Sequence, residues 1–131
     1  MGLNVLIVDD SAVMRAVIMK TLGMSGVPLG TLYQAGNGEQ ALALLKENPV
    51  DLIMLDISMP VMRGDEVLER VRVTPGLEGL PVVVVSSERS GERMDRMRDL
   101  GAEFVSKPFA PEQLRSILMT MGELREAICA E

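Results

Sequence analysis

Aromatic residues and cysteine are scarce in this sequence, and histidine is absent. The chain has one tyrosine, two phenylalanines and no tryptophan among its 131 residues. So few aromatic rings leave no obvious stacking site for a flat cofactor such as a flavin, or for nucleic-acid bases. Cys129 is the single cysteine, which excludes an internal disulfide bond and is typical of a reducing compartment. We therefore expect a cytoplasmic protein without a flavin.

Positive charge is also in deficit, and long apolar runs are missing. Lysine and arginine number 13 against 19 aspartates and glutamates, which gives a formal net charge of −6. Binding to DNA or RNA phosphates requires a positive surface, so we expect no direct nucleic-acid partner. The first four residues lack the basic flank of a signal peptide, and no apolar run approaches the roughly 20 residues that cross a bilayer. The sequence predicts a soluble protein without membrane insertion.

Short β-branched runs alternate with longer segments of helical period. This alternation is typical of βα units around a parallel sheet, and 131 residues with 47% apolar side chains suit one domain over residues 1–131. The predicted strands are Val5–Val8, Leu32–Ala35, Asp51–Leu55, Val82–Val85 and Phe104–Ser106. The predicted helices are Ala12–Leu22, Glu39–Glu47, Gly64–Val71, a segment from Ser90 through Leu100, and one that opens at Pro111. We expect helix caps at Ser11, Asn37 and Ser90, and a glycine stop at Gly101.

Residues able to handle phosphate or a hard metal ion follow four of these strands. Asp9 and Asp10 come after the first strand, Asp56 after the third, Ser86 after the fourth and Lys107 after the fifth. The carboxyl ends of parallel strands share one edge of a sheet, so these side chains are expected in one crevice. Each residue alone has an ordinary interpretation as a turn, cap or surface residue. All of them together favour an acidic functional site with one cation and one hydroxyl.

Four motifs, in order and each at a strand end, give a more specific interpretation. They are Asp9-Asp10-Ser11 with Met14-Arg15, the run Leu55-Asp56-Ile57-Ser58-Met59-Pro60 with Gly64, Ser86-Ser87, and Lys107-Pro108-Phe109. With them, nearly the whole chain resembles the receiver domain of two-component response regulators, most of all the stand-alone chemotaxis type. The resemblance implies an α/β fold of the flavodoxin-like doubly wound (βα)5 kind, a three-layer sandwich with parallel strand order 2-1-3-4-5.

Asp56 is the predicted nucleophile, because a carboxylate can attack a phosphoryl group and form an aspartyl phosphate without a histidine base. Neighbouring carboxylates repel the incoming anion, so the reaction requires positive charge. Mg²⁺ prefers oxygen ligands and retained waters, which suits Asp10, Asp56 and a backbone carbonyl. The resemblance assigns that carbonyl to Ser58 and brings Asp9 to the metal directly or through water. Lys107 is expected to supply a second positive charge to a phosphoryl oxygen.

The resemblance also implies a switch that connects the phosphorylated residue to a docking face. The Ser86 hydroxyl would move toward the phosphoryl group, and the aromatic residue on the fifth strand, Phe104, would swing inward. A downstream target protein would then bind the face made by the fourth helix, the fifth strand and the last helix. On that face we expect Arg93, Arg96, Met97, Arg98 and Met119, although the methionines also have the spacing of core residues.

This sequence departs from the chemotaxis pattern at three positions. Ser58 stands where chemotaxis proteins carry asparagine, beside the path of the attacking water, so the lifetime of the phosphorylated form is left open. Phe104 lacks the hydroxyl of the usual tyrosine, and Arg63 adds a positive charge where an acidic residue is frequent. Glu88 agrees with the chemotaxis type. The resemblance further implies a cis Lys107-Pro108 peptide bond that aims the lysine inward.

The sequence predicts a signalling module that accepts a phosphoryl group from a histidine kinase or a small donor such as acetyl phosphate. We do not expect an enzyme acting on a separate substrate, and we expect a monomer or weak dimer in chemotaxis-type signalling. Two alternatives stay open. A phosphatase of the haloacid dehalogenase kind also uses an aspartyl nucleophile, but it needs a second aspartate where Ser58 stands. A phosphorylation-independent binding module is disfavoured by the complete set of acidic residues and Lys107.

Overall fold

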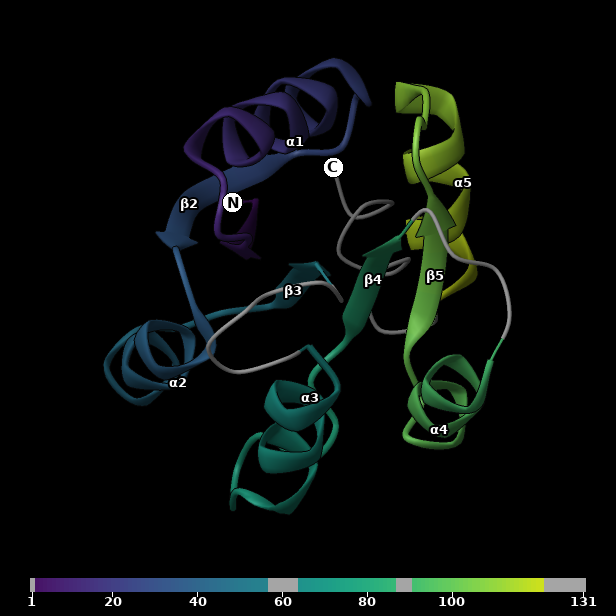
Figure 1. The fold of residues 1–131 in the computed structure, drawn as a ribbon. Helices are drawn as coiled ribbons and strands as arrows, with labels where there is room; N and C mark the ends of the chain where they lie inside the picture. Colours follow the sequence, from purple (N-terminus) through teal and green to yellow (C-terminus); the bar gives the residue numbers. More distant parts are fainter. Residues whose placement is uncertain (1, 57–63, 87–90, 122–131) are drawn as a thin grey trace.

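A parallel five-stranded sheet lies at the centre of the molecule (Figure 1). The computed structural model describes residues 2–56, 64–86 and 91–121. Its strands are β1 (Leu3–Val8), β2 (Leu29–Ala35), β3 (Leu52–Asp56), β4 (Val82–Ser86) and β5 (Glu103–Ser106). Its helices are α1 (Ala12–Met24), α2 (Gly38–Glu47), α3 (Gly64–Val73), α4 (Glu92–Asp99) and α5 (Pro111–Thr120). Within these ranges, no helix combines the length and the apolar character needed to cross a membrane.

The strand order is β2-β1-β3-β4-β5, which confirms the predicted doubly wound topology. All neighbouring strands run parallel, so their carboxyl ends meet at one edge of the sheet. The register pairs Val8 with Leu55 and Asp56 with Val85. It also pairs Ser86 with Ser106, the last residue of β5. This register brings the polar residues that end β3 and β4 to the same edge as those that follow β1 and β5.

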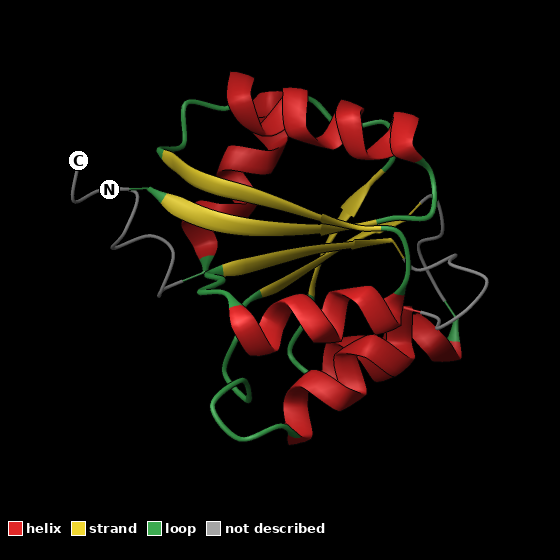
Figure 2. Cartoon of the chain, turned by 90° about the vertical axis from the view of Figure 1, so that its left-hand side faces the viewer, coloured by secondary structure: helices red, strands yellow, loops and turns green. Residues whose placement is uncertain are grey.

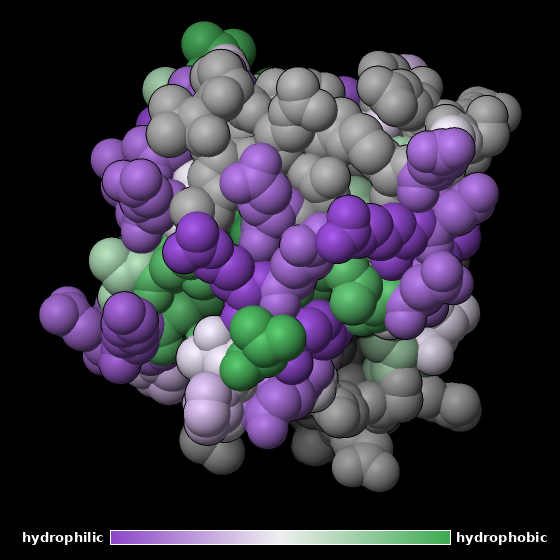
Figure 3. Space-filling model, turned by 60° about the horizontal axis from the view of Figure 1, so that its bottom comes forward, coloured by the Kyte–Doolittle hydropathy of each residue, from purple (hydrophilic) through white to green (hydrophobic). Residues whose placement is uncertain are grey.

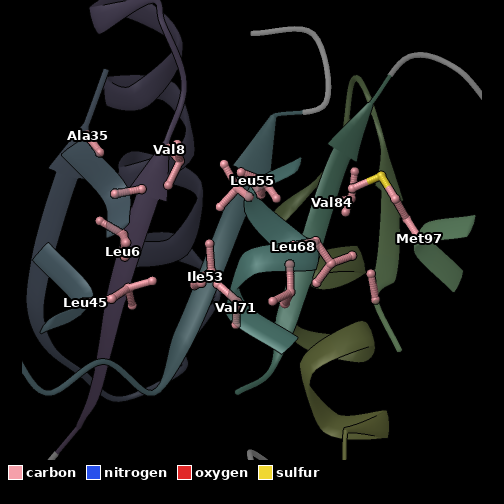
Figure 4. Packing of buried hydrophobic residues seen from close by; sticks show 14 of the residues in the cluster. Leu6, Val8, Ala35, Leu45, Ile53, Leu55, Leu68, Val71, Val84 and Met97 are labelled. Carbon is pink, nitrogen blue, oxygen red and sulfur yellow. The ribbon is translucent and has the colours of Figure 1, made fainter. Parts of the chain in front are cut away.

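Helices cover both faces of the sheet, as Figure 2 shows. Successive residues of a strand point to opposite faces, and β1 divides accordingly. Leu6 and Val8 pack into a cluster with α2, α3 and α4, whereas Val5 and Ile7 pack with α1 and α5. Figure 4 shows the first cluster from nearby. Burial on both faces explains the unbroken valines of Val82–Val85, each of which gains roughly 1.5–3 kcal/mol from leaving water.

Two of the predicted side-chain caps are confirmed. The Ser11 hydroxyl accepts a hydrogen bond from the Met14 N–H at 3.2 Å and opens α1. The Asn37 side chain accepts from the Gln40 N–H at 2.9 Å and opens α2. Each cap satisfies an N–H that has no partner within its own helix, which contributes about 1 kcal/mol to stability. The starts of these two helices therefore follow from local sequence.

The predicted cap at Ser90 is wrong, because Gly91 occupies the cap position of α4. Gly91 has a φ of 124°, a backbone conformation that residues other than glycine rarely adopt. It offers no side-chain hydrogen bond to the helix. Ser90 itself lies outside the described residues. The predicted stop at Gly101 is confirmed: its φ is 86°, and its N–H donates to the Arg98 carbonyl at 2.9 Å.

Some element boundaries differ from the prediction. Strand β2 begins at Leu29 rather than Leu32, because the side chain of Asn4 on β1 accepts a hydrogen bond from the Thr31 N–H at 2.8 Å. Strand β3 is shifted by one residue, so Asp56 is its last residue instead of the residue after it. Asp56 is consequently held within the sheet, where it pairs with Val85 of β4.

Met97 belongs to the core and not to an exposed docking face. Its side chain is fully buried in the cluster that contains Val84 (Figure 4), and Met94, three residues earlier, is buried with it. The helical spacing turns both methionines toward the sheet. Met119 is half-buried against the other cluster.

The arginines that accompany these methionines on α4 lie at the surface. Arg96 and Arg98 are exposed, as predicted, whereas the Arg93 side chain is not among those described. Figure 3 looks onto the side where α3 and α4 lie at the bottom of Figure 1, and it shows a mostly hydrophilic surface. The exposed part of α4 is therefore polar and positively charged at these two positions.

Candidate functional site

Three aspartates gather at the carboxyl edge of the sheet. Asp9 and Asp10 directly follow β1, and Asp56 ends the adjacent β3. One carboxylate oxygen from each lies within 4.8 Å of those from the other two. Asp9 and Asp56 are only 1% and 5% exposed, whereas Asp10 is exposed. The structure thus brings together the acidic residues that the sequence placed at one edge.

Lys107 directly follows the edge strand β5 and reaches this cluster with its side chain. Its ammonium nitrogen Nζ lies 3.7 Å from Oδ1 of Asp56, and its backbone N–H donates to the Ser86 carbonyl at 2.9 Å. The Lys107-Pro108 peptide bond is cis, as the resemblance implied. Ser86 is 2% exposed and ends β4 between Asp56 and Lys107 in strand order. Among the described residues, the ammonium group of Lys107 and the buried hydroxyl of Ser86 thus lie at this edge beside the three carboxylates.

The Asp9 side chain has one satisfied and one unsatisfied oxygen. Oδ1 accepts a hydrogen bond from the Ser11 N–H at 2.9 Å. Oδ2 is buried and has no hydrogen-bond partner in the part of the chain that the structure describes. A buried carboxylate oxygen without a donor is costly unless a cation or a proton accompanies it. This orphaned oxygen fits a site for a hard cation such as Mg²⁺, which takes carboxylate oxygens as ligands.

Burial raises the pKa of the Asp9 carboxyl from 3.8 to about 6. The negative charge of Asp56 and the neighbouring carboxyl of Asp10 contribute to the rise, while the Ser11 N–H and the positive charge of Lys107 lower the pKa. Without a further positive charge, the cluster therefore keeps a proton on Asp9 up to a higher pH, about 6, than an ordinary aspartate does. A divalent cation bound to these oxygens would favour the ionised form instead.

One neighbour of the cluster received no role from the sequence. Arg15 on α1 donates from Nη1 to the Asp9 carbonyl at 2.7 Å and from Nε to Oε1 of Gln34 at 3.1 Å. The signal that could have found it is its place in the opening motif, five residues after Asp10. Its partners, directly after β1 and on β2, become visible only when the fold is known.

Of the other predicted site residues, only Phe104 is among the described residues. Phe104 lies half-buried on β5 and packs against the first cluster. Ser58, with the predicted carbonyl ligand, lies outside the described residues, as do Arg63 and Glu88. The contribution of these three residues to the site stays a prediction.

Comparison with known families places this edge in a familiar context. A family model of the response regulator receiver domain matches residues 5–119. The chain belongs to this family. Receiver domains bind Mg²⁺ at an acidic pocket, accept phosphate from histidine kinases and act on downstream targets. The described residues of this chain likewise include an acidic cluster, made by Asp9, Asp10 and Asp56.

The chain is similar to parts of longer proteins. It is 44% identical over 109 residues, 81% of its length, to the protein-glutamate methylesterase/protein-glutamine glutaminase of Bacillus licheniformis, of which it spans 29%. It is 40% identical over 113 residues, 86% of its length, to two-component response regulator ORR6 of Oryza sativa subsp. japonica, of which it spans 66%. The chain thus spans less than two thirds of the length of these curated relatives.

Solved structures agree with the family. The receiver is similar to chemotaxis protein CheY4 of Vibrio cholerae, with a TM-score of 0.81 and 32% identity, over 92% of this chain and 99% of the other. A second structure, the chemotaxis response regulator CheY4 of Vibrio cholerae, gives a TM-score of 0.76 and 31% identity, over 95% and 99% of the two chains. This chain is accordingly a receiver domain of the CheY type.

Proposed function

We propose that this receiver takes a phosphoryl group onto a carboxylate oxygen of Asp56 in a Mg²⁺-dependent reaction. One observation carries the proposal: Asp56 ends β3 inside the acidic cluster and 3.7 Å from Nζ of Lys107. A nucleophile of this kind needs positive charge at the point where phosphoryl charge develops. Lys107 supplies one positive charge, and the three carboxylates could bind a metal ion that supplies more.

The reaction is a transfer of the phosphoryl group from donor to protein. An oxygen of ionised Asp56 attacks phosphorus, a new P–O bond forms, and the bond from phosphorus to the donor breaks. With a histidine kinase the broken bond is P–N and the imidazole takes a proton from solvent, whereas with acetyl phosphate the broken bond is P–O and acetate leaves. Asp56 has no proton to lose, which agrees with a chain that contains no histidine.

Four residues would hold the metal ion. Asp10, Asp56 and the backbone carbonyl of Ser58 are the proposed direct ligands, and Asp9 acts directly or through water. When bound, Mg²⁺ supplies positive charge that offsets the repulsion between carboxylates and phosphoryl oxygens. Lys107 donates from Nζ to a phosphoryl oxygen and keeps a second positive charge beside Asp56.

Phosphorylation would be signalled to a target protein through the face made by α4, β5 and α5. We propose that the Ser86 hydroxyl follows the phosphoryl group and that Phe104 changes position with it, so that a target protein binds a changed surface. Arg96 and Arg98 are exposed on this face, and each is paired with an acidic side chain of the chain itself, Glu69 and Asp95. Similarity to CheY4 over most of both chains supports chemotaxis-type signalling.

We further propose the state in which the protein works. Residues 1–131 would form one receiver domain, a monomer or weak dimer in the cytoplasm, with a histidine kinase as phosphodonor. It would catalyse only its own phosphorylation and dephosphorylation and would not act as an enzyme on a separate substrate. A net charge of −6 supports the absence of a direct nucleic-acid partner.

The test is the intact mass of the protein after incubation with acetyl phosphate, with and without Mg²⁺. We expect a gain of one phosphoryl group that requires the metal and is lost in Asp56→Asn. Asp51→Asn is the matched control, because Asp51 is an exposed aspartate beside the amino end of β3 and accepts a hydrogen bond from the Asn4 N–H at 2.8 Å.

If no mass is gained, the next measurement is binding of beryllofluoride, which imitates a bound phosphoryl group. Binding of beryllofluoride that requires Asp56 would show a site with very fast hydrolysis. No binding would instead favour a phosphorylation-independent module.

A further inference from the structure

Arg15 links three parts of the molecule that meet behind the acidic cluster. It lies one turn into α1, where its backbone N–H donates to the Ser11 carbonyl at 3.0 Å. Its guanidinium donates from Nη1 to the Asp9 carbonyl at 2.7 Å and from Nε to Oε1 of Gln34 at 3.1 Å. Gln34 belongs to β2 and Asp9 directly follows β1. The planar fork of the arginine therefore ties α1 to the ends of both strands.

Hydrogen bonds hold Asp9 through both its backbone N–H and its backbone carbonyl. Its N–H donates to the Ala35 carbonyl at 3.1 Å, its carbonyl accepts from Arg15, and its side-chain Oδ1 accepts from the Ser11 N–H at 2.9 Å. Oδ2 is the buried oxygen without a partner in the described residues. Asp9 is thus anchored through every polar atom except the one available to a cation.

We propose that Arg15 is a positioning residue for the metal site. It holds the main chain of Asp9 so that the carboxylates of the acidic pair keep the separation from Asp56 that a cation requires. The inference rests on the proposed function, because it concerns the same metal site. Partners behind a metal ligand commonly change metal affinity by ten- to a hundredfold, although they touch no metal.

The charge of Arg15 and its hydrogen bonds have opposite effects on metal binding. As a charge, a guanidinium near the cluster repels a cation, so its removal should strengthen Mg²⁺ binding. As a positioning group it orders the ligands, so its removal should weaken binding. The sign of the change in affinity therefore separates the two roles, and a role in stability alone would leave the affinity unchanged.

The experiment is a Mg²⁺ titration of the whole chain at neutral pH, measured by isothermal titration calorimetry. We expect Arg15→Gln to weaken binding on the order of tenfold, and Arg15→Lys, which keeps the charge and one donor, to lie between. Lys20→Gln is the matched control, because it removes one positive charge from the exposed surface of the same helix. Urea unfolding without metal establishes that each variant is folded at the titration temperature.

Gln34→Ala gives an independent arm, because it removes the second anchor of the arginine and touches no carboxylate. We expect a smaller loss of affinity in the wild-type background and almost none in the Arg15→Gln background, since the two residues act through one contact. This double-mutant cycle also decides the matter if Arg15→Gln proves unfolded, with Arg15→Lys in its place.

Each outcome has one meaning. Unchanged or tighter Mg²⁺ binding in Arg15→Gln, with wild-type binding intact, overturns the positioning role and leaves the proposed function standing. The same holds if Arg15→Lys and Gln34→Ala both bind as the wild type does. A wild-type chain that binds no Mg²⁺ overturns the proposed metal site and the positioning role with it.

Discussion

The guanidinium of Arg98 on α4 lies over the ring of Phe104 on β5, with its central carbon Cζ 4.8 Å from the ring centroid. Attraction between a cation and an aromatic face contributes about 0.5–1 kcal/mol at an exposed site. Arg98 also pairs with Asp95 at 3.3 Å. The ring that the proposed switch would move is thus held from outside by a residue of the docking face. This contact does not depend on the hydroxyl that Phe104 lacks.

Arg98→Ala should change the environment and mobility of the Phe104 ring. Loss of the cation removes the group that covers one face of the ring. The chain has only two phenylalanines, so fluorine-labelled phenylalanine gives two resonances, and Phe104→Leu assigns them. We expect Arg98→Ala to shift the Phe104 resonance and to enlarge its response to beryllofluoride.

Arg96→Ala is the control for this experiment. Arg96 is exposed on the same helix, but its partner is Glu69 at 2.6 Å. It should leave the Phe104 resonance nearly unchanged. An equal shift in both variants would show that the resonance reports on the charge of α4 and not on the contact.

Lys107→Ala should slow phosphorylation and strengthen metal binding at the same time. The ammonium 3.7 Å from Asp56 would stabilise phosphoryl charge in the transition state, and loss of such a group costs on the order of tenfold or more in rate. The same charge repels a cation in the cluster, so its removal favours Mg²⁺. The rate follows from the time course of intact mass with acetyl phosphate, and the affinity from a Mg²⁺ titration.

Lys46→Ala serves as the matched substitution, because Lys46 is exposed in the last turn of α2. It should change neither quantity. Weaker Mg²⁺ binding in Lys107→Ala would contradict the expected opposition of signs and would indicate that the lysine orders the site.

The sequence alone identified most of the sheet and the edge that carries the site. Val82–Val85 could be read as a strand because an unbroken valine run suits a strand covered on both faces, and all four are buried. Asp56, Ser86 and Lys107 could be placed together because parallel strands end at one edge. The strand order came from family resemblance, since local sequence does not determine which strands are neighbours.

Contacts between distant residues could not be read from local patterns. Arg15 and Gln34 are 19 positions apart, and their hydrogen bond depends on the packing of α1 against β1 and β2. The early start of β2 depends in the same way on the side chain of Asn4, 27 positions before Thr31. Met97 was ambiguous because the spacing that suits a core face also suits a docking face, and only the position of α4 decides.

The stability of the metal-free protein should fall as pH rises from about 4 to 6. In this range Asp9 is deprotonated in the unfolded chain but keeps its proton in the folded one, because burial raises its pKa to about 6. The folded state therefore binds more protons, and the free energy of unfolding decreases with pH. Below pH 4 both states are protonated and the effect is absent.

Asp9→Asn isolates this contribution, because the amide stays neutral at every pH. Relative to the wild type, the variant should gain on the order of 1–3 kcal/mol of stability between pH 4 and pH 7 in urea unfolding without metal. Asp51→Asn, at an exposed site, should show the wild-type profile. Parallel profiles for wild type and Asp9→Asn would contradict the raised pKa.

Arg72 should contribute more to folding than its exposed neighbour Arg70 on α3. Its guanidinium donates to the backbone carbonyls of Leu100 at 2.6 Å, Leu80 at 2.7 Å and Glu78 at 3.2 Å, which joins α3 to the end of α4 and to the loop before β4. Hydrogen bonds from a charged donor contribute about 1.5–3 kcal/mol net.

We expect Arg72→Ala to lower the free energy of unfolding by about 1.5–3 kcal/mol, because the three carbonyls lose a donor that water replaces only in part. Arg70→Ala removes the same side chain from an exposed position and should cost less than about 0.5 kcal/mol. Urea unfolding of both variants under one condition measures the difference. Equal destabilisation would mean that solvent satisfies these carbonyls as well as the arginine does, and that Arg72 contributes nothing specific to the packing of α3 against α4.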